Sequence, residues 1–337
     1  MMPPFGKSSL IEAAPPPNSM ATKVVVTGGA GFIGSHVADA LIERGFDVHV
    51  IDNLSSGKRE RLNPKAVLHE VDIRDKGALG PIFADAQFVF HLAALARVQP
   101  SIKDPQPSHD SNINGTFNVL QAASKANVKR VMYSASSSAY GNQDRLPLTE
   151  DMTPRPMSPY ALQKLVGEYY CRLFSALYGL ETVSLRYFNV YGPRQTTASD
   201  GPYATVVGIF LEQRQNGQPL TIVPDGEQRR DFTHVRDVVA ANLLAMDSPR
   251  VGHGEVVNIG TGRNYRVREI ANLIGGSTVF VEPRVEPKET SADITKAREL
   301  LGWEPRERFE DGIAELKQLH GINIPASGLA AAPRQEL

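Results

Sequence analysis

The segment KVVVTGGAGFIG, residues 23–34, decides the fold of this chain. Its first part, Val24–Val26, is a short apolar run typical of a buried strand, and Ile33–Arg44 has the apolar spacing of a helix. The glycines between them fit GxGxxG over residues 29–34, which permits a tight turn and lets the backbone approach a pyrophosphate. The N-terminus of the helix offers unpaired N–H groups to the phosphates. The segment therefore predicts a dinucleotide-binding loop.

An acidic residue supports this interpretation. The run Asp47–Ile51 is typical of a second strand, and Asp52 ends it, 18 residues past Gly34. A carboxylate at this point can accept hydrogen bonds from the ribose hydroxyls of adenosine and repels a 2′-phosphate. The expected cofactor is therefore NAD rather than NADP. The other interpretation is a structural glycine turn followed by a surface aspartate.

Further apolar runs alternate with helical stretches along the chain. Four more strands are expected, at Val67–Val71, Phe88–Leu92, Arg130–Ser134 and Thr182–Tyr187. Two long helices are expected between or after them, at Asn112–Ala126 and Ser158–Tyr178. Such alternation predicts an α/β fold with a parallel, doubly wound sheet. After Gly192 the spacing becomes irregular, and a late strand at Val256–Ile259 with a helix at Val267–Ile274 indicates a smaller, mixed domain.

The composition limits what the chain can do. Its 337 residues include 36 Lys and Arg against 37 Asp and Glu, so no global field attracts nucleic acid or a membrane surface. No apolar run approaches the roughly 18–20 residues of a membrane span. The single cysteine, Cys171, cannot pair within the chain and favours a reducing compartment, so a cytoplasmic protein is expected. The eight histidines form no ligand cluster, and no metal site is predicted.

A tyrosine and a lysine open the helix expected after Ser158. Tyr160 and Lys164 are four residues apart and therefore share one helix face. A free tyrosine has a pKa near 10 and is a poor base, but an ammonium beside it and a positive nicotinamide ring would favour the phenolate. Taken alone, this spacing is typical of an amphipathic helix surface. Downstream of a dinucleotide loop, it indicates a proton-transfer pair.

A serine-rich stretch follows the fifth expected strand. Residues 134–141 are SASSSAYG, and the carboxyl ends of strands in an open α/β sheet border the ligand crevice. Hydroxyls placed there can bond a reacting alcohol or carbonyl. The alternative is a turn whose hydroxyls bond their own backbone.

Five stretches together resemble one family. In order along the chain, GGAGFIG, DNLSSG, SSSAYG, YALQK and RYFNVYGPR are similar to the extended short-chain dehydrogenase/reductases, and in particular to the UDP-hexose 4-epimerases. The resemblance covers residues 23 to about 304. It implies a Rossmann-type sheet with a smaller mixed α/β substrate-binding domain, NAD as cofactor and a UDP-sugar as substrate. The implied reaction is transient oxidation at C4 of the sugar, rotation of the 4-keto sugar, and return of the hydride to the other face.

The resemblance also implies a division of the chain. The NAD-binding domain is expected over residues 21–190 together with about 231–258, and the UDP-sugar-binding domain over 191–230 and 259–320. A disordered lead-in is expected over residues 1–20, which contain a proline cluster, and a flexible tail over 321–337.

The resemblance implies catalytic and binding roles for the residues of this chain that match the family's motifs. The implied catalytic residues are Tyr160, Lys164 and Ser136. Besides Tyr160 and Lys164, the implied NAD-binding residues are Gly28, Gly31, Phe32, Ile33, Gly34, Asp52, Asn53, Ser55, Asp72, Ile73, Leu92, Ala93, Ala94, Ser111, Tyr187 and Phe188. The implied substrate-binding residues are Ser136, Ser138, Asn189, Thr205, Arg230, Arg284 and Thr290.

Two positions bear on the substrate. The family often has Arg-x-Gly-Asp where this chain has Arg284-Val-Glu-Pro-Lys288, so the basic group that meets the diphosphate stays open. Thr290 falls at the position that restricts the sugar in the family, and its small side chain implies some activity on UDP-N-acetylhexosamines. Related enzymes pair through the long helix after Lys164, which implies a homodimer.

Three other functions compete with this one. Nucleotide-sugar dehydratases and decarboxylases usually have an acidic residue where this chain has Ser138-Ala139, so elimination is disfavoured. A 4-epimerase of UDP-uronic acids also uses a serine run and stays open. A non-catalytic NAD-binding scaffold would commonly lose the tyrosine or the lysine, and this chain has both.

Overall fold

A computed structural model describes residues 21–201, 204–282 and 288–322. The lead-in expected over 1–20, most of the tail expected over 321–337, and Arg284 lie outside these residues. None of the helices within the described ranges is both long and apolar enough to cross a membrane.

A seven-stranded parallel sheet forms the centre of the protein. Its strand order is β11-β6-β5-β4-β1-β2-β3, and every pairing is parallel. The strands are β1 (Lys23–Thr27), β2 (Asp47–Ile51), β3 (Val67–His69), β4 (Phe88–His91), β5 (Arg130–Ser136), β6 (Glu181–Tyr187) and β11 (His253–Ile259). The valines of β1 are fully buried, as expected of a strand covered on both faces. The predicted doubly wound sheet is confirmed.

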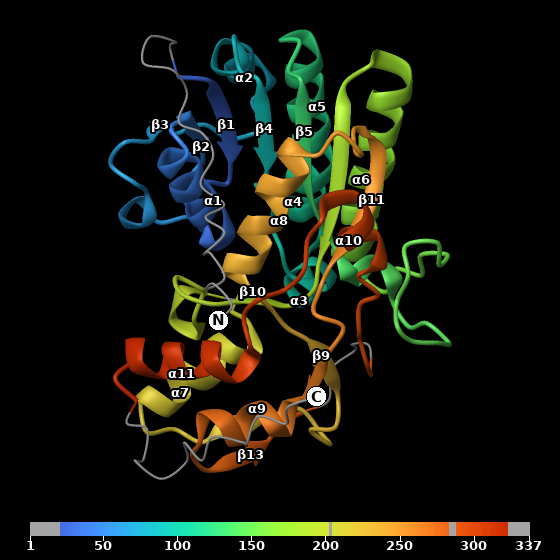
Figure 1. Ribbon diagram of the computed structural model, residues 1–337. Helices are drawn as coiled ribbons and strands as arrows, with labels where there is room; N and C mark the ends of the chain where they lie inside the picture. Colours follow the sequence, from blue (N-terminus) through green and yellow to red (C-terminus); the bar gives the residue numbers. More distant parts are fainter. Residues whose placement is uncertain (1–20, 202–203, 283–287, 323–337) are drawn as a thin grey trace, which may run out of the picture.

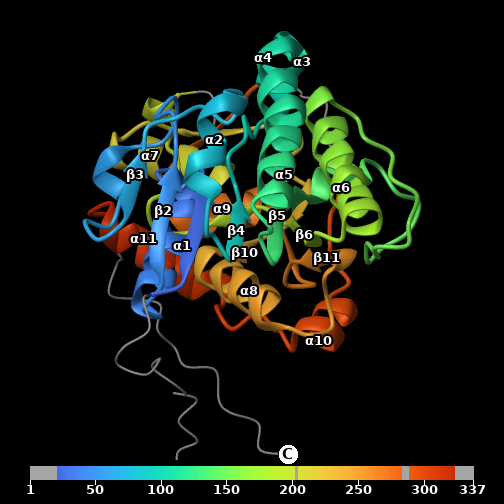
Figure 2. The same cartoon turned by 90° about the horizontal axis from the view of Figure 1, so that it is seen from above.

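Helices cover both faces of this sheet (Figure 2). On one face lie α1 (Phe32–Glu43) and α8 (Val235–Asp247), and on the other lie α2 (Lys76–Phe83), α5 (Thr116–Lys125) and α6 (Pro159–Tyr178). Because successive side chains of a strand point to opposite faces, Val24 and Val26 join the core beneath α1 and α8, whereas Val25 joins the core beneath the other helices.

Several predicted boundaries were wrong. The late strand expected from Val256 begins at His253 and is β11, an edge strand of the main sheet. The strand expected to reach Val71 ends at His69, because the amide of Val71 turns back to donate to the His69 carbonyl at 2.9 Å. The fifth strand continues to Ser136 rather than stopping at Ser134. The helix expected from Asn112 is a π-helical turn over Asp110–Gly115 that leads into α5.

A second group of small elements lies below the carboxyl ends of the main strands (Figure 1). Three two-stranded pairs occur there: β7 (Val190–Tyr191) with β10 (Thr233–His234), β8 (Leu220–Ile222) with β13 (Thr278–Phe280), and β9 (Arg229–Asp231) with β12 (Asn264–Arg266). Helices α7 (Val206–Gln215), α9 (Val267–Ile274) and α11 (Phe309–Leu319) share a third apolar core with them.

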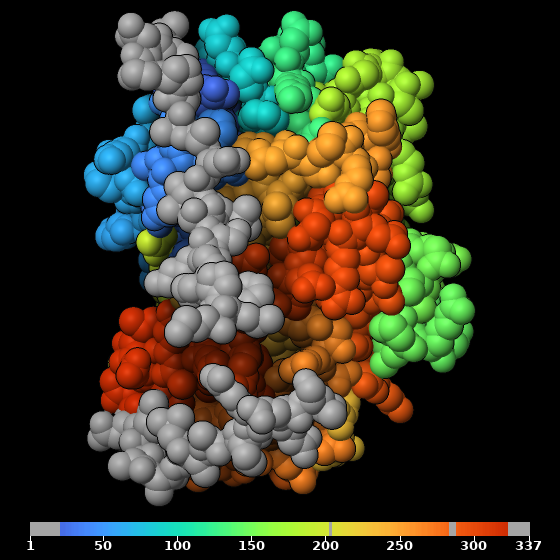
Figure 3. All heavy atoms as spheres, viewed as in Figure 1, coloured from blue at the N-terminus to red at the C-terminus, as the bar shows by residue number. Residues whose placement is uncertain are grey.

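The chain passes between the two groups more than once. After β9 and β10 it forms α8 and β11 on the main sheet, and after α9 it forms α10 (Thr295–Leu301), which packs on α8 and β11. Figure 3 accordingly shows red C-terminal segments in both the upper and the lower part of the molecule. The carboxyl ends of the main strands therefore face residues from distant parts of the sequence.

Candidate active site

The glycine loop joins β1 to α1 at the carboxyl edge of the sheet. Gly28 has φ +72°, and a Cβ added there would stand 2.7 Å from the Ala93 amide nitrogen. A Cβ on Gly34 would stand 2.1 Å from the Gly28 carbonyl oxygen. Gly31 is the N-cap residue of α1, so Phe32 and Ile33 form its first turn and leave N–H groups open to an anion. This side-chain-free cradle fits the pyrophosphate of a dinucleotide.

Asp52 stands immediately after β2. Its Oδ2 accepts a hydrogen bond from the Ala30 amide and its Oδ1 one from the Leu54 amide, both at 2.9 Å. Burial raises the pKa of Asp52, and these two bonds oppose the rise. Each oxygen keeps a lone pair, so the carboxylate can still accept from ribose hydroxyls.

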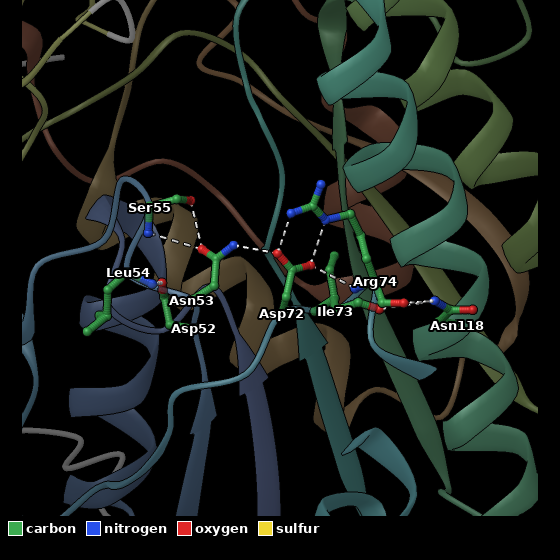
Figure 4. Close-up of polar contacts among 8 residues, drawn as sticks. All are labelled: Asp52, Asn53, Leu54, Ser55, Asp72, Ile73, Arg74 and Asn118. Carbon is green, nitrogen blue, oxygen red and sulfur yellow. Dashed lines mark hydrogen bonds and ion pairs between the residues drawn. The ribbon is translucent and has the colours of Figure 1, made fainter. Parts of the chain in front are cut away.

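The residues expected at the adenosine end form one polar network (Figure 4). Asn53 Oδ1 accepts from the amide and the hydroxyl of Ser55, at 3.1 and 2.7 Å. Asn53 Nδ2 donates to Asp72 Oδ2 at 2.7 Å. Ile73 is buried beneath Asp72, and a Cβ added to Gly115 would meet its side chain. The structure thus brings residues from the ends of β2 and β3 together.

The segment after β4 is held by a buried asparagine. Leu92, Ala93 and Ala94 follow β4, and the Ala93 amide donates to the Thr27 hydroxyl at 3.2 Å. The side chain of Asn112 accepts from the Leu95 amide at 2.8 Å and donates to the Leu95 carbonyl at 3.1 Å. Ser111 precedes Asn112 in the π-helical turn. Sequence reasoning missed this clamp.

Tyr160 lies in the first turn of α6, opposite the end of β5. The Tyr160 amide donates to the hydroxyl of Ser101 in α3 (Val98–Lys103) at 3.1 Å. Burial raises the pKa of the phenol above its ordinary value, and a hydrogen bond from Ser136 lowers it. Ser136 also lies 2.8 Å from the hydroxyl of Ser138 and accepts from its amide, so part of the serine run is structural.

Arg97 is a second residue that sequence reasoning missed. It is the N-cap residue of α3, in the segment that leaves the carboxyl end of β4. Its positive charge lowers the pKa of Tyr160. Burial lowers the pKa of Arg97 itself, and the charge of Tyr160 opposes that effect. A basic residue after a strand end is the only sequence signal that could have pointed to it.

Lys164 is almost fully buried one turn after Tyr160. Its Nζ donates to the Ser134 carbonyl at 2.7 Å, which places the amine at the end of β5. Burial lowers the pKa of Lys164 to about 8, although the charge of Glu168 raises it. The amine thus bonds the backbone of β5.

Two aromatic residues expected near the nicotinamide are buried at the carboxyl end of β6. The Tyr187 hydroxyl exchanges hydrogen bonds with the amide of Asn242 in α8, at 2.8 and 3.1 Å. Phe188 is fully buried, with its ring centre 6.3 Å from that of Tyr140. The structure therefore directs the Tyr187 hydroxyl toward α8 rather than toward Tyr160.

Three of the expected substrate residues gather around β9. Asn189 Nδ2 donates to the Asp231 carbonyl at 2.9 Å, and the Thr290 amide donates to the Arg229 carbonyl at 3.1 Å. Arg230 lies on β9 between these two contacts and donates to the Arg229 carbonyl at 2.9 Å. Thr205 lies apart from them and caps α7 through its hydroxyl.

Asp231 organises this region and was also missed. Its buried carboxylate accepts hydrogen bonds from the amides of Thr261, Gly262 and Ala292, at 2.8, 2.9 and 3.0 Å. Burial raises its pKa, and these bonds oppose the rise. The carboxylate thus ties the segment after β11 to the segment that contains Thr290. Among the described residues, no group of three or more His, Cys, Asp or Glu is arranged to hold a metal ion.

Strand order β3-β2-β1-β4-β5-β6, a glycine loop after the first strand and a carboxylate after the second define a Rossmann-type dinucleotide-binding protein. The chain belongs to the NAD dependent epimerase/dehydratase family, whose model matches residues 24–260. NAD is therefore its cofactor.

Relatives cover nearly the whole chain. A putative UDP-glucose 4-epimerase of Methanocaldococcus jannaschii is 41% identical over 299 residues, which cover 86% of this chain and 95% of the relative. The crystal structure of a Thermotoga maritima UDP-glucose 4-epimerase with UDP-glucose has a TM-score of 0.84 and 42% identity, covering 89% of this chain and 98% of that one. That of a Bacillus cereus UDP-glucuronic acid 4-epimerase, with UDP-glucuronic acid and NAD, has a TM-score of 0.80 and 32% identity, covering 88% and 100%.

Proposed function

We propose that this protein is an NAD-dependent UDP-hexose 4-epimerase. The observation that carries the proposal is the Tyr160 phenol, bonded by Ser136, at the same sheet edge as the glycine loop. Relatives named UDP-glucose 4-epimerase, alike over nearly their full length, support it.

The side chains divide the proton chemistry between them. Tyr160, as phenolate, accepts the proton of the sugar 4-hydroxyl, and Ser136 donates a hydrogen bond to the same oxygen while it gains carbonyl character. Bound NAD would supply the acceptor, and then the donor, of the C4 hydride. Lys164, whose Nζ bonds the Ser134 carbonyl at the end of β5, would hold the nicotinamide ribose and keep a positive charge near the phenol. After the sugar turns over, Tyr160 returns its proton to the 4-oxygen of the epimer.

The small elements below the sheet would anchor the UDP. Asn189 and Thr290 contact β9, on which Arg230 lies, and Thr205 begins α7. Rotation of the sugar requires strong polar contacts on the nucleotide and few on the hexose. On this basis we also propose the domain division stated above, with residues 191–230 and 259–320 binding UDP, except that β10 belongs with the small elements and α10 packs on the NAD-binding sheet.

A UDP-uronic acid is a second candidate substrate, and Arg97 is the observation that favours it. The positive charge of Arg97 lowers the pKa of the Tyr160 phenol, which accepts the proton of the sugar 4-hydroxyl in the proposed reaction. The carboxylate of a uronic acid is attached at C5, next to the reacting C4. A guanidinium near that point can bind it with paired hydrogen bonds. Elimination chemistry is disfavoured, because Ser138 and Ala139 supply no carboxylate.

Product analysis by NMR tests these assignments. Wild-type protein with NAD is incubated separately with UDP-glucose, UDP-N-acetylglucosamine and UDP-glucuronate, and Tyr160→Phe is the matched variant. We expect 4-epimers from at least one sugar, and a loss of about 10²–10⁴-fold in Tyr160→Phe. Full-speed epimerisation by Tyr160→Phe contradicts the mechanism. A product formed by loss of water or of carbon dioxide from the substrate contradicts the epimerase function.

Arg97→Gln separates the two substrate classes. If Arg97 binds a sugar carboxylate, this variant loses UDP-glucuronate turnover mainly through KM, and far more than it loses UDP-glucose turnover. If Arg97 acts only through the phenol, both substrates lose kcat/KM to the same extent, and the acid limb of the pH profile moves to higher pH, because the pKa of Tyr160 rises.

The exposed face of α6 supports a homodimer. Leu162, Tyr169, Leu173 and Leu177 lie along this helix and are 50%, 49%, 49% and 68% exposed. An apolar stripe of this kind favours burial against a second copy. Sedimentation analysis should show a dimer that Leu173→Glu weakens. Leu319→Glu, which alters an equally apolar residue of α11, should not change the sedimentation.

A further inference from the structure

Arg186 lies between the two parts of the protein that carry the proton chemistry. It is in β6, where it pairs with Ala135 of β5, one residue before Ser136. Helix α6, which carries Tyr160 and Lys164 in its first two turns, packs against both strands (Figure 2). The Arg186 side chain is buried. With so little surface, it can act on the reaction only through its neighbours.

The Arg186 guanidinium holds α6 through Glu168. Its Nε and Nη2 donate to the two carboxylate oxygens of Glu168, at 2.8 and 2.7 Å. Glu168 is buried as well, and it stands one turn after Lys164 and two turns after Tyr160. A planar fork that makes two parallel bonds fixes both the distance and the orientation of its partner. The pair therefore fixes where α6 stands relative to β6.

The same guanidinium also holds the serine-rich turn. Its carbon lies 4.5 Å from the centre of the Tyr140 ring, and the face of an aromatic ring attracts a cation, most strongly away from water. Tyr140 ends the 3₁₀ turn η3 (Ser137–Tyr140), which directly follows Ser136 and is capped by it. The Tyr140 hydroxyl donates to Asn258 Oδ1 in β11 at 2.7 Å. The turn that begins at Ser136 is thus fixed at its last residue.

Tyr160 and Ser136 belong to separate elements, and their alignment depends on how those elements are held. The hydrogen bond from Ser136 to the phenol joins them, and it lowers the pKa of Tyr160. Reacting atoms must lie within about 3–3.5 Å, and a misplacement of about 1 Å can cost about 100-fold in rate. Because Arg186 contacts both elements at once, a change in its contacts would shift one element against the other.

We propose that Arg186 is a positioning residue for the proton transfer. Through Glu168 it holds α6, and through Tyr140 it holds the serine-rich turn. Its place between them sets the Tyr160 phenol against the Ser136 hydroxyl. If the ion pair served the fold alone, removing both charges together would leave the reaction unchanged. This inference rests on the proposed function, because the aligned groups act on the sugar 4-oxygen.

The double variant Glu168→Leu/Arg186→Met tests this inference on the holoenzyme. It removes one charge of each sign and fills the space with apolar groups, so the fold should survive. We expect kcat for the UDP-sugar to fall about 100-fold at the top of the pH profile, with KM and bound NAD unchanged. Rates are compared at that point because the loss of Glu168 also changes the pKa of Lys164. A double variant that folds and keeps the wild-type kcat overturns the proposal.

A matched pair of variants at Tyr140 isolates the contact with the serine-rich turn. Tyr140→Phe keeps an aromatic face beside Arg186 and should keep most of kcat. Tyr140→Leu removes the ring, and its kcat should approach that of the double variant. Both variants lose the hydrogen bond to Asn258, so this bond cannot explain a difference between them. Equal kcat in the two variants also overturns the proposal.

Absorbance titration of the phenol, with NAD bound, supplies a readout that does not depend on turnover. The tyrosinate signal of Tyr160 is the difference between each protein and the same protein with Tyr160→Phe. The pKa of Tyr160 should be higher in the double variant than in the wild type, because a misaligned Ser136 no longer lowers it. A pair that serves only the fold would leave this pKa unchanged, and an unchanged value counts against the alignment.

These measurements separate a failure of the positioning role from a failure of the proposed function. A wild type that converts no UDP-sugar refutes the epimerase function, while the titration still decides whether Arg186 aligns Tyr160 with Ser136. A wild type that epimerises, with a double variant of equal kcat and an unshifted titration, refutes only the positioning role.

Discussion

Replacing Glu168 by Gln should cost this protein a large part of its stability. Glu168 in α6 and Arg186 in β6 form a two-bond ion pair, at 2.8 and 2.7 Å, and each side chain is only 3% exposed. Removing one charge leaves the Arg186 guanidinium buried without its counter-ion, which typically costs about 3–5 kcal/mol. At about 2–3 °C per kcal/mol for a chain of this size, Tm should fall by roughly 6–15 °C.

The assay is thermal unfolding with NAD saturating and protein concentration fixed. Two controls give the result its meaning. The double variant Glu168→Leu/Arg186→Met removes both charges and should lie closer to the wild type than Glu168→Gln does. Arg44→Met breaks an exposed pair with Asp247, which contributes less than about 1 kcal/mol. If Glu168→Gln unfolds at the same temperature as Arg44→Met, the reasoning from burial is refuted.

Glu168→Gln should also change the pKa of Lys164 in the active site. Glu168 lies one turn after Lys164 on α6, and its charge raises the pKa of the Lys164 amine against the effect of burial. Loss of that charge should move the pKa of Lys164 further below about 8. The alkaline limb of the rate profile should then begin at lower pH in Glu168→Gln than in the wild type.

Other perturbations have equally definite outcomes. Gly34→Ala should lose NAD, because the added Cβ would stand 2.1 Å from the Gly28 carbonyl oxygen. The control Gly80→Ala, whose Cβ would have nothing within 4 Å, should keep NAD. The measurement is the nucleotide that stays bound after desalting. Since the pKa of Lys164 is about 8, kcat/KM should fall as the pH rises through that value. In Lys164→Arg this fall should move to higher pH. If the alkaline limb of the profile does not move, the limb belongs to another group. Thr290→Tyr should lower turnover of UDP-N-acetylglucosamine relative to UDP-glucose, and equal or better turnover of the acetylated sugar would show that residue 290 does not limit the sugar.

The local motifs of the site were accessible from the sequence because their chemistry is local. The glycine loop, its helix and Asp52 lie within 30 residues, and each needs a fixed place relative to a strand end. The spacing of Tyr160 and Lys164 likewise depends only on the helix that contains them. The structure places all of these residues along one edge of the sheet.

The residues that were missed act across long separations. Arg97 and Tyr160 are 63 residues apart in the sequence, and only the packing of α3 on α6 brings the guanidinium to the phenol. Asp231 bonds Thr261 and Ala292, which are 30 and 61 residues away. Nothing in the spacing of these residues marks them, because their role depends on which strands become neighbours.

Sequence alone thus determined the sheet and the cofactor and predicted the proton-transfer pair, since alternating apolar runs, a glycine cradle and a helix repeat are short-range properties of a chain. Tertiary structure decided which charges surround the phenol, where the Tyr187 hydroxyl points, and how Asp72 is held. These features arise where side chains from separate strands and helices share one desolvated edge, and their energies depend on that burial and those distances.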